Sequence, residues 1–369
     1  MSITETQYFA LLRSGLWNTP AVVDGAIDWQ GVMQLAQHHA NIVLISGVAM
    51  QLPDAQRPTV EMQQLMQKAM RGNLVKQLRL RQILVSAIQL LRQHDIKPVL
   101  LKGFGLASLY PNPNLRQFGD IDLFVGLEHF HEACALLRTL SGGYNWGGEV
   151  DAGHHYNIEF GHFPLEVHRL SADVSDPDEA PVYAAIERDG LIDHPQVLNL
   201  DGTEVCIPSK EFMVFFTFYH AWHHFLTSGV GWRQISDVAM TLHAYDGQLD
   251  TEKMKRWLND MNLLLPWQTF GMLMVKHLGL PEAEMPFFDA QCDRRTRKLY
   301  KRVMEEGNFK RVNNFKRHRP KTAGFKRKVH AAVGIFIDFF HIAKVFPDTA
   351  FRQLRSALKV SWKKNLQKK

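Results

Sequence analysis

Two aspartates separated by one residue, Asp120 and Asp122, are the side chains of this chain best suited to metal chemistry. They open an apolar, β-favouring run that continues to Val125. Successive side chains of a strand point to opposite faces, so both carboxylates are expected on one face, about 6.6 Å apart along the strand. Such a pair can hold two divalent cations, and enzymes use two metal ions to clamp the attacking and leaving oxygens of a phosphoryl displacement.

A third carboxylate, Glu166, lies in a second apolar run, residues 164–168. An isolated buried carboxylate is costly, so three of them on neighbouring strands predict something positive between them. Lys102, just ahead of a glycine-rich turn, offers one cation. His168 shares a face with Glu166 in a regular strand, where it orients the carboxylate, contacts substrate or makes a structural hydrogen bond.

The elements that would position these residues begin with a helical region. Apolar residues recur every three or four positions up to about Gln93, which is the helical period. One predicted apolar stripe consists of Leu74, Leu78, Leu84, Ile88 and Leu91. The last helix of this region is expected to end before Pro98, because proline disfavours helical geometry in the preceding residue.

The middle of the chain alternates short strands, turns and helices. Gly103 and Gly105 fit a tight turn into a helix that runs through Tyr110 and ends at Pro111. Strands are predicted over residues 99–101, 120–125, 155–160 and 164–168, a helix over 128–140 and a loop over 141–148. A hairpin centred on Asp201 and Gly202 follows, and then an almost wholly apolar, buried helix over 212–226.

This order predicts an α+β fold. We expect an N-terminal helical region at residues 1–95, a small mixed sheet at 96–207, a helical domain at 208–291 and a basic helical tail at 292–369.

Composition narrows the class of protein. With 369 residues, 46% of them hydrophobic, the chain can bury a sizeable core, which excludes a wholly disordered protein. It has no apolar run long enough for a membrane span and no secretory pattern at its start, so a cytoplasmic location is expected. Cys134, Cys206 and Cys292 are widely spaced, which predicts ordinary reduced thiols.

Charge is distributed unevenly along the chain. Residues 292–369 carry 23 Lys and Arg against 5 Asp and Glu, whereas the other residues carry 20 against 32. The basic tail would suit nucleic acid, an anionic membrane surface or an acidic partner, or is simply a solvated helical surface. Its apolar segment 329–346 either packs against the helical domain or lies on a membrane as an amphipathic helix.

Other motifs leave alternatives open. His220 and His224 have the spacing that places two imidazoles on one helix face, which fits a zinc site, a pocket or the core. Arg233 and Asp237 are either pocket residues or an ordinary ion pair along a helix. His154 and His155 are accounted for as loop residues beside a glycine, and the chain has no P-loop, dinucleotide-binding or nucleophile-elbow motif.

At the aspartate block the chain resembles the nucleotidyltransferase superfamily with the DNA polymerase β-like fold, and more closely its uncharacterised members of the NTP_transf_5 type. The resemblance extends over most of the chain. It includes the turn at 99–103, the segment 109–111, Arg116 with the block 119–123, the run 165–168, and the later pattern of His220, His224, Arg233 and Asp237.

The resemblance implies a sheet flanked by helices. It also implies that Asp120, Asp122 and Glu166 bind two Mg²⁺ ions, which Mn²⁺ could replace. The implied reaction is transfer of a nucleoside monophosphate from an NTP with release of pyrophosphate. Gly103 and Gly105 would let backbone amides approach the triphosphate, with Lys102 and Arg116 as the cations on it.

ATP is the expected nucleotide. The first choice of acceptor is a small molecule such as a sugar or sugar phosphate of polysaccharide biosynthesis, and the second is a protein side chain. A polynucleotide acceptor would suit the basic tail. The rival hypothesis is a non-catalytic nucleotide-binding or scaffold protein, attached to a membrane or nucleic acid through that tail.

Overall fold

The computed structural model describes residues 1–142, 153–174, 176–308, 333–334, 336–337 and 339–366, and only the backbone beyond residue 356. It divides into two compact units. The first comprises residues 1–173, 185–215 and 240–249, and the second comprises 174–184, 216–239 and 250–369. The boundaries predicted at residues 95, 207 and 291 stay a prediction.

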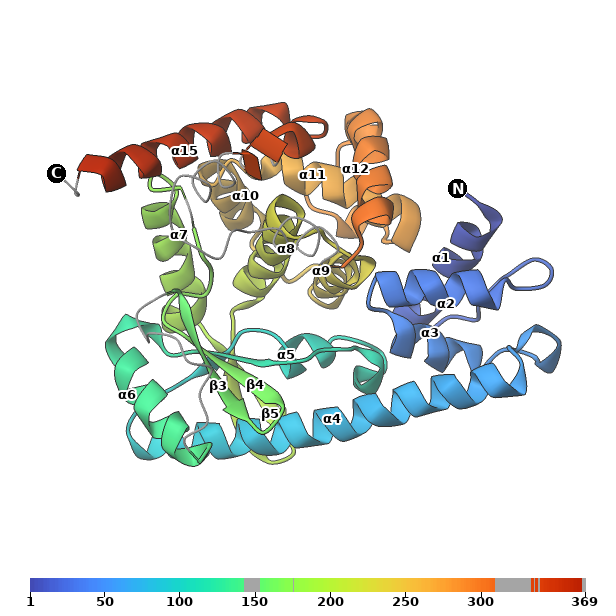
Figure 1. The fold of residues 1–369 in the computed structure, drawn as a ribbon, viewed down its shortest axis with the longest axis horizontal. Coiled ribbons are helices and arrows are strands. Elements are labelled where there is room, and N and C mark those ends of the chain that lie inside the picture. Colours follow the sequence, from blue (N-terminus) through green and yellow to red (C-terminus); the bar gives the residue numbers. More distant parts are fainter. Residues whose placement is uncertain (143–152, 175, 309–332, 335, 338, 367–369) are drawn as a thin grey trace. The chain divides into compact units, whose positions relative to one another are not determined.

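The first unit contains a six-stranded mixed sheet, the one sheet within the described residues (Figure 1). Its strands are β1 (Val99–Leu100), β2 (Ile121–Phe124), β3 (His155–Phe160), β4 (Phe163–His168), β5 (Gln196–Leu200) and β6 (Thr203–Ile207). They lie in the order β3-β4-β2-β1-β6-β5. β2 pairs with β4 and β1 with β6 in parallel, and the other three pairs are antiparallel. The predicted α+β fold is confirmed.

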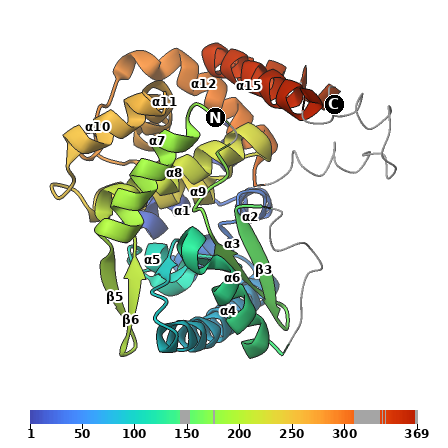
Figure 2. The same ribbon diagram turned by 90° about the vertical axis from the view of Figure 1, so that its left-hand side faces the viewer.

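Six helices accompany the sheet in this unit: α1 (Ile3–Trp17), α2 (Trp29–His38), α3 (Ile42–Ala49), α4 (Val60–Gln93), α5 (Phe104–Ala107) and α6 (Gly126–Leu140). α6 packs on β3 and β4, and α4 packs on α6 and α3. In Figure 2, α6 is seen in front of the sheet, with the edge strands β5 and β3 to either side of it. The hairpin turns at Asp201 and Gly202, both with positive φ, as the sequence predicts.

Two predictions about the helices need correction. Leu74 and Leu78 are 42% and 51% exposed, because α4 turns its buried side toward residues 112–116, where amides of Asn73 and Gln77 bind backbone oxygens. The helix after the glycine turn ends at Ala107. Beyond it Leu109 and Tyr110 make tighter backbone bonds to residues three earlier, since Pro111 disfavours helical geometry just before it.

Three helices contribute to both units: α7 (Ala180–Glu187), α8 (Lys210–Thr227) and α9 (Trp232–Ala244). The second unit also has α10 (Thr251–Asp260), α11 (Leu264–Leu273), α12 (Asp293–Glu306) and α15 (Pro347–Leu366). Its aromatic core includes Trp222 and Phe225, stacked on one another, and Phe346, which meets both rings edge-on.

The apolar tail segment 329–346 is buried in one part and exposed in another. Ile342, Val345 and Phe346 are buried, whereas Phe336 and Phe340 are exposed, and residues 329–332, 335 and 338 lie outside the described residues. Most of the predicted loop over 141–148 also lies outside them. None of the described helices is both long and apolar enough to cross a membrane.

Candidate active site

One face of the sheet gathers the polar side chains that sequence analysis singles out. Asp122 on β2 lies opposite Glu166 on β4 in the parallel register, and His168, two residues along β4, lies opposite His155 on β3. Because alternate residues of a strand share a face and cross-strand neighbours project to the same side, these four side chains emerge together.

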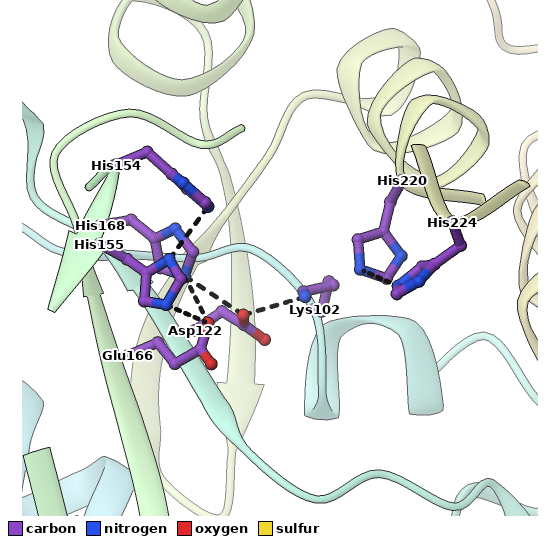
Figure 3. A network of polar contacts seen from close by, with 8 residues as sticks. All are labelled: Lys102, Asp122, His154, His155, Glu166, His168, His220 and His224. Atoms are coloured by element: carbon purple, nitrogen blue, oxygen red, sulfur yellow. Dashed lines mark hydrogen bonds and ion pairs between the residues drawn. The ribbon is translucent and has the colours of Figure 1, made fainter. Parts of the chain in front are cut away.

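The backbone also places Lys102 beside them. The amide of Leu101 donates a hydrogen bond to the backbone oxygen of Asp122, and the next residue brings its amine to the carboxylate. Lys102 Nζ lies 2.9 Å from Asp122 Oδ1 (Figure 3). His168 Nε2 lies 3.3 Å both from that oxygen and from Glu166 Oε2. Both neighbours of Nε2 are carboxylates, so this nitrogen carries the proton.

The charges of this cluster depend on one another. Burial alone would raise the pKa of Asp122, but Lys102 and His168 lower it well below its usual range, so the fully buried carboxylate is ionised. Burial lowers the pKa of His168, yet hydrogen bonds to Asp122 and Glu166 outweigh it and raise the value to about 9. For Lys102 the carboxylates likewise outweigh burial and raise its pKa. Two cations therefore face the acidic side chains.

The cluster has the donors that a hard divalent cation prefers. Ligand atoms of Asp122, Glu166 and His168 lie within 4.8 Å of one another. Asp122 Oδ2 is buried and has no hydrogen-bond partner among the described residues, which leaves a carboxylate oxygen for a further cation. Carboxylate oxygens are the ligands that Mg²⁺ prefers, so the residues present fit that ion.

Asp120 lies outside this group of donors. It precedes β2, is half-buried and contributes to the potential that raises the pKa of Lys102. Its joint metal binding with Asp122 stays a prediction.

The glycine turn is held by Arg116. Gly103 has φ +60°, and its backbone oxygen accepts a 3.0 Å hydrogen bond from Arg116 Nη1. The guanidinium also lies 5.6 Å from the centre of the Phe118 ring, and Gln77 Nε2 donates to the backbone oxygen of Arg116 at 2.9 Å. Arg116 is 4% exposed. It supports the turn beside Lys102, and its contact with a triphosphate stays a prediction.

Gly105 is buried in the same turn, and a Cβ there would meet the Ile207 side chain at 3.4 Å. Its predicted approach to the triphosphate is also untested.

The other predicted pocket residues belong to the second unit. His220 and His224 on α8 face each other with their Nε2 atoms 3.2 Å apart, and Nδ1 of His224 lies 2.8 Å from Ser228 Oγ. Within the described part of the chain no third metal-ligating side chain joins these two histidines. Arg233 and the buried Asp237 lie on α9. Their part in a pocket with the aspartates stays a prediction.

Sequence reasoning missed His154 and His155. His155 is the first residue of β3, which confirms the strand predicted over 155–160. Its Nε2 lies 3.7 Å from Glu166 Oε2, so the alternative interpretation of His155 as a loop residue is wrong. Its Nδ1 lies 3.0 Å from His154 Nε2. The alternation of polar residues with Tyr156 and Ile158 is the signal that places His155 on the polar face.

Comparison with known proteins identifies a family and a similar solved structure. Residues 25–279, more than half of the chain, match the family described as uncharacterised nucleotidyltransferase. A crystal structure of an antigenic nucleotidyltransferase-like protein from Paracoccidioides brasiliensis is similar over 57% of this chain and 94% of its own, with 15% identity and a TM-score of 0.35. No curated protein matches.

Proposed function

This chain belongs to the uncharacterised nucleotidyltransferase family, and from this premise we propose that it transfers a nucleoside monophosphate from an NTP, with ATP favoured, to an acceptor and releases pyrophosphate. The supporting observation is the buried sheet face on which Lys102, Asp122, Glu166 and His168 meet. Family membership supports nucleotidyl transfer in general, and the nucleotide, the acceptor and the metal are parts of the proposal.

Asp122 and Glu166 would hold Mg²⁺. Asp120, two residues before Asp122 in the chain, is proposed as a further ligand. Bound there, Mg²⁺ would supply positive charge to the phosphoryl oxygens. Lys102, already ionised beside Asp122, would neutralise charge that develops on the leaving pyrophosphate. Arg116 and Gly103 keep the backbone of this lysine in place.

For the acceptor we propose a hydroxyl-bearing small molecule, a sugar or sugar phosphate. Glu166 is 23% exposed at its side chain, whereas Asp122 is fully buried. Of the two carboxylates, Glu166 is therefore the one that an acceptor hydroxyl can approach, and it would help to remove the hydroxyl proton.

Turnover of a panel of NTPs, measured as pyrophosphate release with sugars and sugar phosphates, tests this proposal. Asp122→Asn should abolish release, because it removes the charge on the buried ligand and keeps its shape. Glu204→Gln is the matched control, since it changes an exposed carboxylate of the same sheet and should keep the wild-type rate. Equal rates for wild type and Asp122→Asn would reject the proposal, and NTP binding without dependence on Mg²⁺ would favour a non-catalytic binding protein.

A further inference from the structure

Three imidazoles come together beside the carboxylates. His154, His155 and His168 have ring centres 4.4, 5.0 and 5.7 Å apart in pairs (Figure 3). One ring nitrogen of each lies within 4.8 Å of the other two. Nitrogens at this spacing can close around a single ion through small rotations of the rings.

The backbone fixes all three positions. His155 and His168 are directly opposed residues of the antiparallel pair β3–β4. The backbone oxygen of His154 accepts hydrogen bonds from the amides of Arg169 and Leu170, at 3.0 and 3.3 Å. Each histidine is therefore tied to the edge hairpin of the sheet, which favours a site formed before the ion arrives.

One nitrogen in this group lacks a partner. His168 is 3% exposed, and its Nδ1 is buried with no hydrogen-bond partner among the described residues. Its Nε2 faces Asp122 and Glu166 and holds the ring. A metal-bound histidine commonly has this arrangement, with one nitrogen donating to a carboxylate and the other bound to the metal. Metal binding at Nδ1 would release the second proton that makes His168 a cation in the metal-free chain.

We propose that His154, His155 and His168 form a binding site for a single transition-metal cation of the Zn²⁺ class. Imidazole nitrogens suit Zn²⁺ and its neighbours, whereas Mg²⁺ prefers the oxygens of Asp122 and Glu166. Three protein ligands leave one position of a tetrahedral ion open. Glu166 contacts both His155 and His168 and positions their rings.

The test is metal binding by the tag-free full chain after removal of metal by a chelator, without nucleotide, so that it does not depend on transferase activity. Titration with Co²⁺ should give the visible absorption of a tetrahedral ion at one equivalent, and Zn²⁺ should displace it while Mg²⁺ should not. His154→Ala and His155→Ala should each weaken binding of Co²⁺ and Zn²⁺ about tenfold or more.

His162→Ala is the matched control, because His162 is exposed in the turn that joins β3 to β4 and should leave affinity unchanged. Far-ultraviolet circular dichroism of each variant verifies the fold. His154 precedes β3, so its replacement leaves the strand pairing intact and keeps the test valid if His155→Ala fails to fold. Wild-type affinity in His154→Ala, absence of Co²⁺ binding by wild type, or loss of binding in His220→Ala instead would overturn the proposal.

Discussion

The charge of Asp122 depends on its two neighbouring cations, Lys102 and His168. Its side chain is fully buried and lies 2.9 Å from Lys102 Nζ. Removing Lys102 would leave this buried charge with His168 as its remaining cation, and a buried charge that loses a partner costs more than the pair itself contributes. Lys102 is therefore a structural residue as well as a proposed phosphate ligand.

Lys102→Met should lower the free energy of unfolding by about 3–5 kcal/mol, because it keeps the length of the side chain and removes its charge. Urea denaturation measures the change. Lys97→Met, at an exposed lysine of the preceding loop, should stay within about 0.5 kcal/mol of wild type. A Lys102→Met variant as stable as the Lys97 control would show that Asp122 is not dependent on this amine. Adding Asp122→Asn to Lys102→Met should recover part of the loss.

The sequence predicts some of these residues better than others. Asp122 and Glu166 follow from carboxylates inside apolar strand patterns, where burial demands a positive partner. The contacts of Arg116 could not be predicted, because its guanidinium donates to the backbone oxygen of Gly103 and its own backbone oxygen accepts from Gln77 on α4, and both partners are distant in sequence. The strand predicted over 155–160 includes His155, but its contact with Glu166 could not be predicted, because it depends on the pairing of two strands.

Among the elements, the Gly103 turn is the one whose backbone requires a particular residue. With φ +60° and ψ −114°, Gly103 lies where residues with a side chain are rarely found, although an added Cβ would make only ordinary van der Waals contacts, the nearest at 3.6 Å on Phe118. A side chain at position 103 would therefore strain the backbone without a clash between side chains.

Gly103→Ala should destabilise the chain by about 1–2 kcal/mol through that strain. Gly72→Ala is the opposite case, since Gly72 lies inside α4 with open space around it and should gain about 0.5–1 kcal/mol. Thermal unfolding of the two variants should therefore move in opposite directions. A shift of the same sign in both would contradict the assigned conformation of the turn.

The end of α2 holds a buried histidine. His39 is 0% exposed, and its ring centre lies 5.9 Å from that of Tyr8 and 4.8 Å from that of His38. Burial, helped by His38, lowers the pKa of His39 from its usual value of 6.5 to about 3. Between these values the unfolded chain binds a proton that the folded chain does not, so stability falls as pH decreases through this window.

His39→Leu should remove that pH dependence. Between pH 7 and pH 5 wild type should lose about 2 kcal/mol more than the variant, from the difference of pKa values. His162→Leu, at an exposed position, should keep the wild-type slope. Urea denaturation at both pH values gives the slopes, and identical slopes for wild type and His39→Leu would refute a buried neutral His39.

The elements were predictable where periodicity and turn residues agree. The alternation of strands β3 and β4 and the Asp201-Gly202 turn lie where the sequence places them. The predicted apolar stripe on α4 is wrong at Leu74 and Leu78. A hydrophobic pattern assigns polar residues to the surface, whereas the side-chain amides of Asn73 and Gln77 are buried here. Side-chain hydrogen bonds to residues 114 and 116 instead place Asn73 and Gln77 on the buried side of the helix.

At the scale of the whole molecule, the main feature is the concentration of positive charge toward the C-terminus. In the second unit a cavity of about 540 Å³ is lined by four cations, Arg294, Arg295, Lys298 and Lys344, with Asp289 as a lining carboxylate. Together with the basic residues of 292–369, this supports the proposal of an anionic partner for the tail.

Replacing Lys326, Arg327 and Lys328 with glutamate should lower the salt concentration at which the full chain elutes from heparin. Exchanging Lys68, Arg71 and Lys97 for glutamate changes net charge equally in the acidic part of the chain and should have a smaller effect, since clustered charge governs polyanion binding. Equal shifts would show that net charge alone governs retention.

The proposed transfer requires above all that Asp122 and Glu166 hold the metal of a bound nucleotide. Isothermal titration of the full chain with a non-hydrolysable ATP analogue, with and without Mg²⁺, tests it directly. We predict that Mg²⁺ strengthens binding at least tenfold in wild type and in Glu204→Gln, and has no effect in Asp122→Asn. Equal strengthening by Mg²⁺ in Asp122→Asn would contradict the claim.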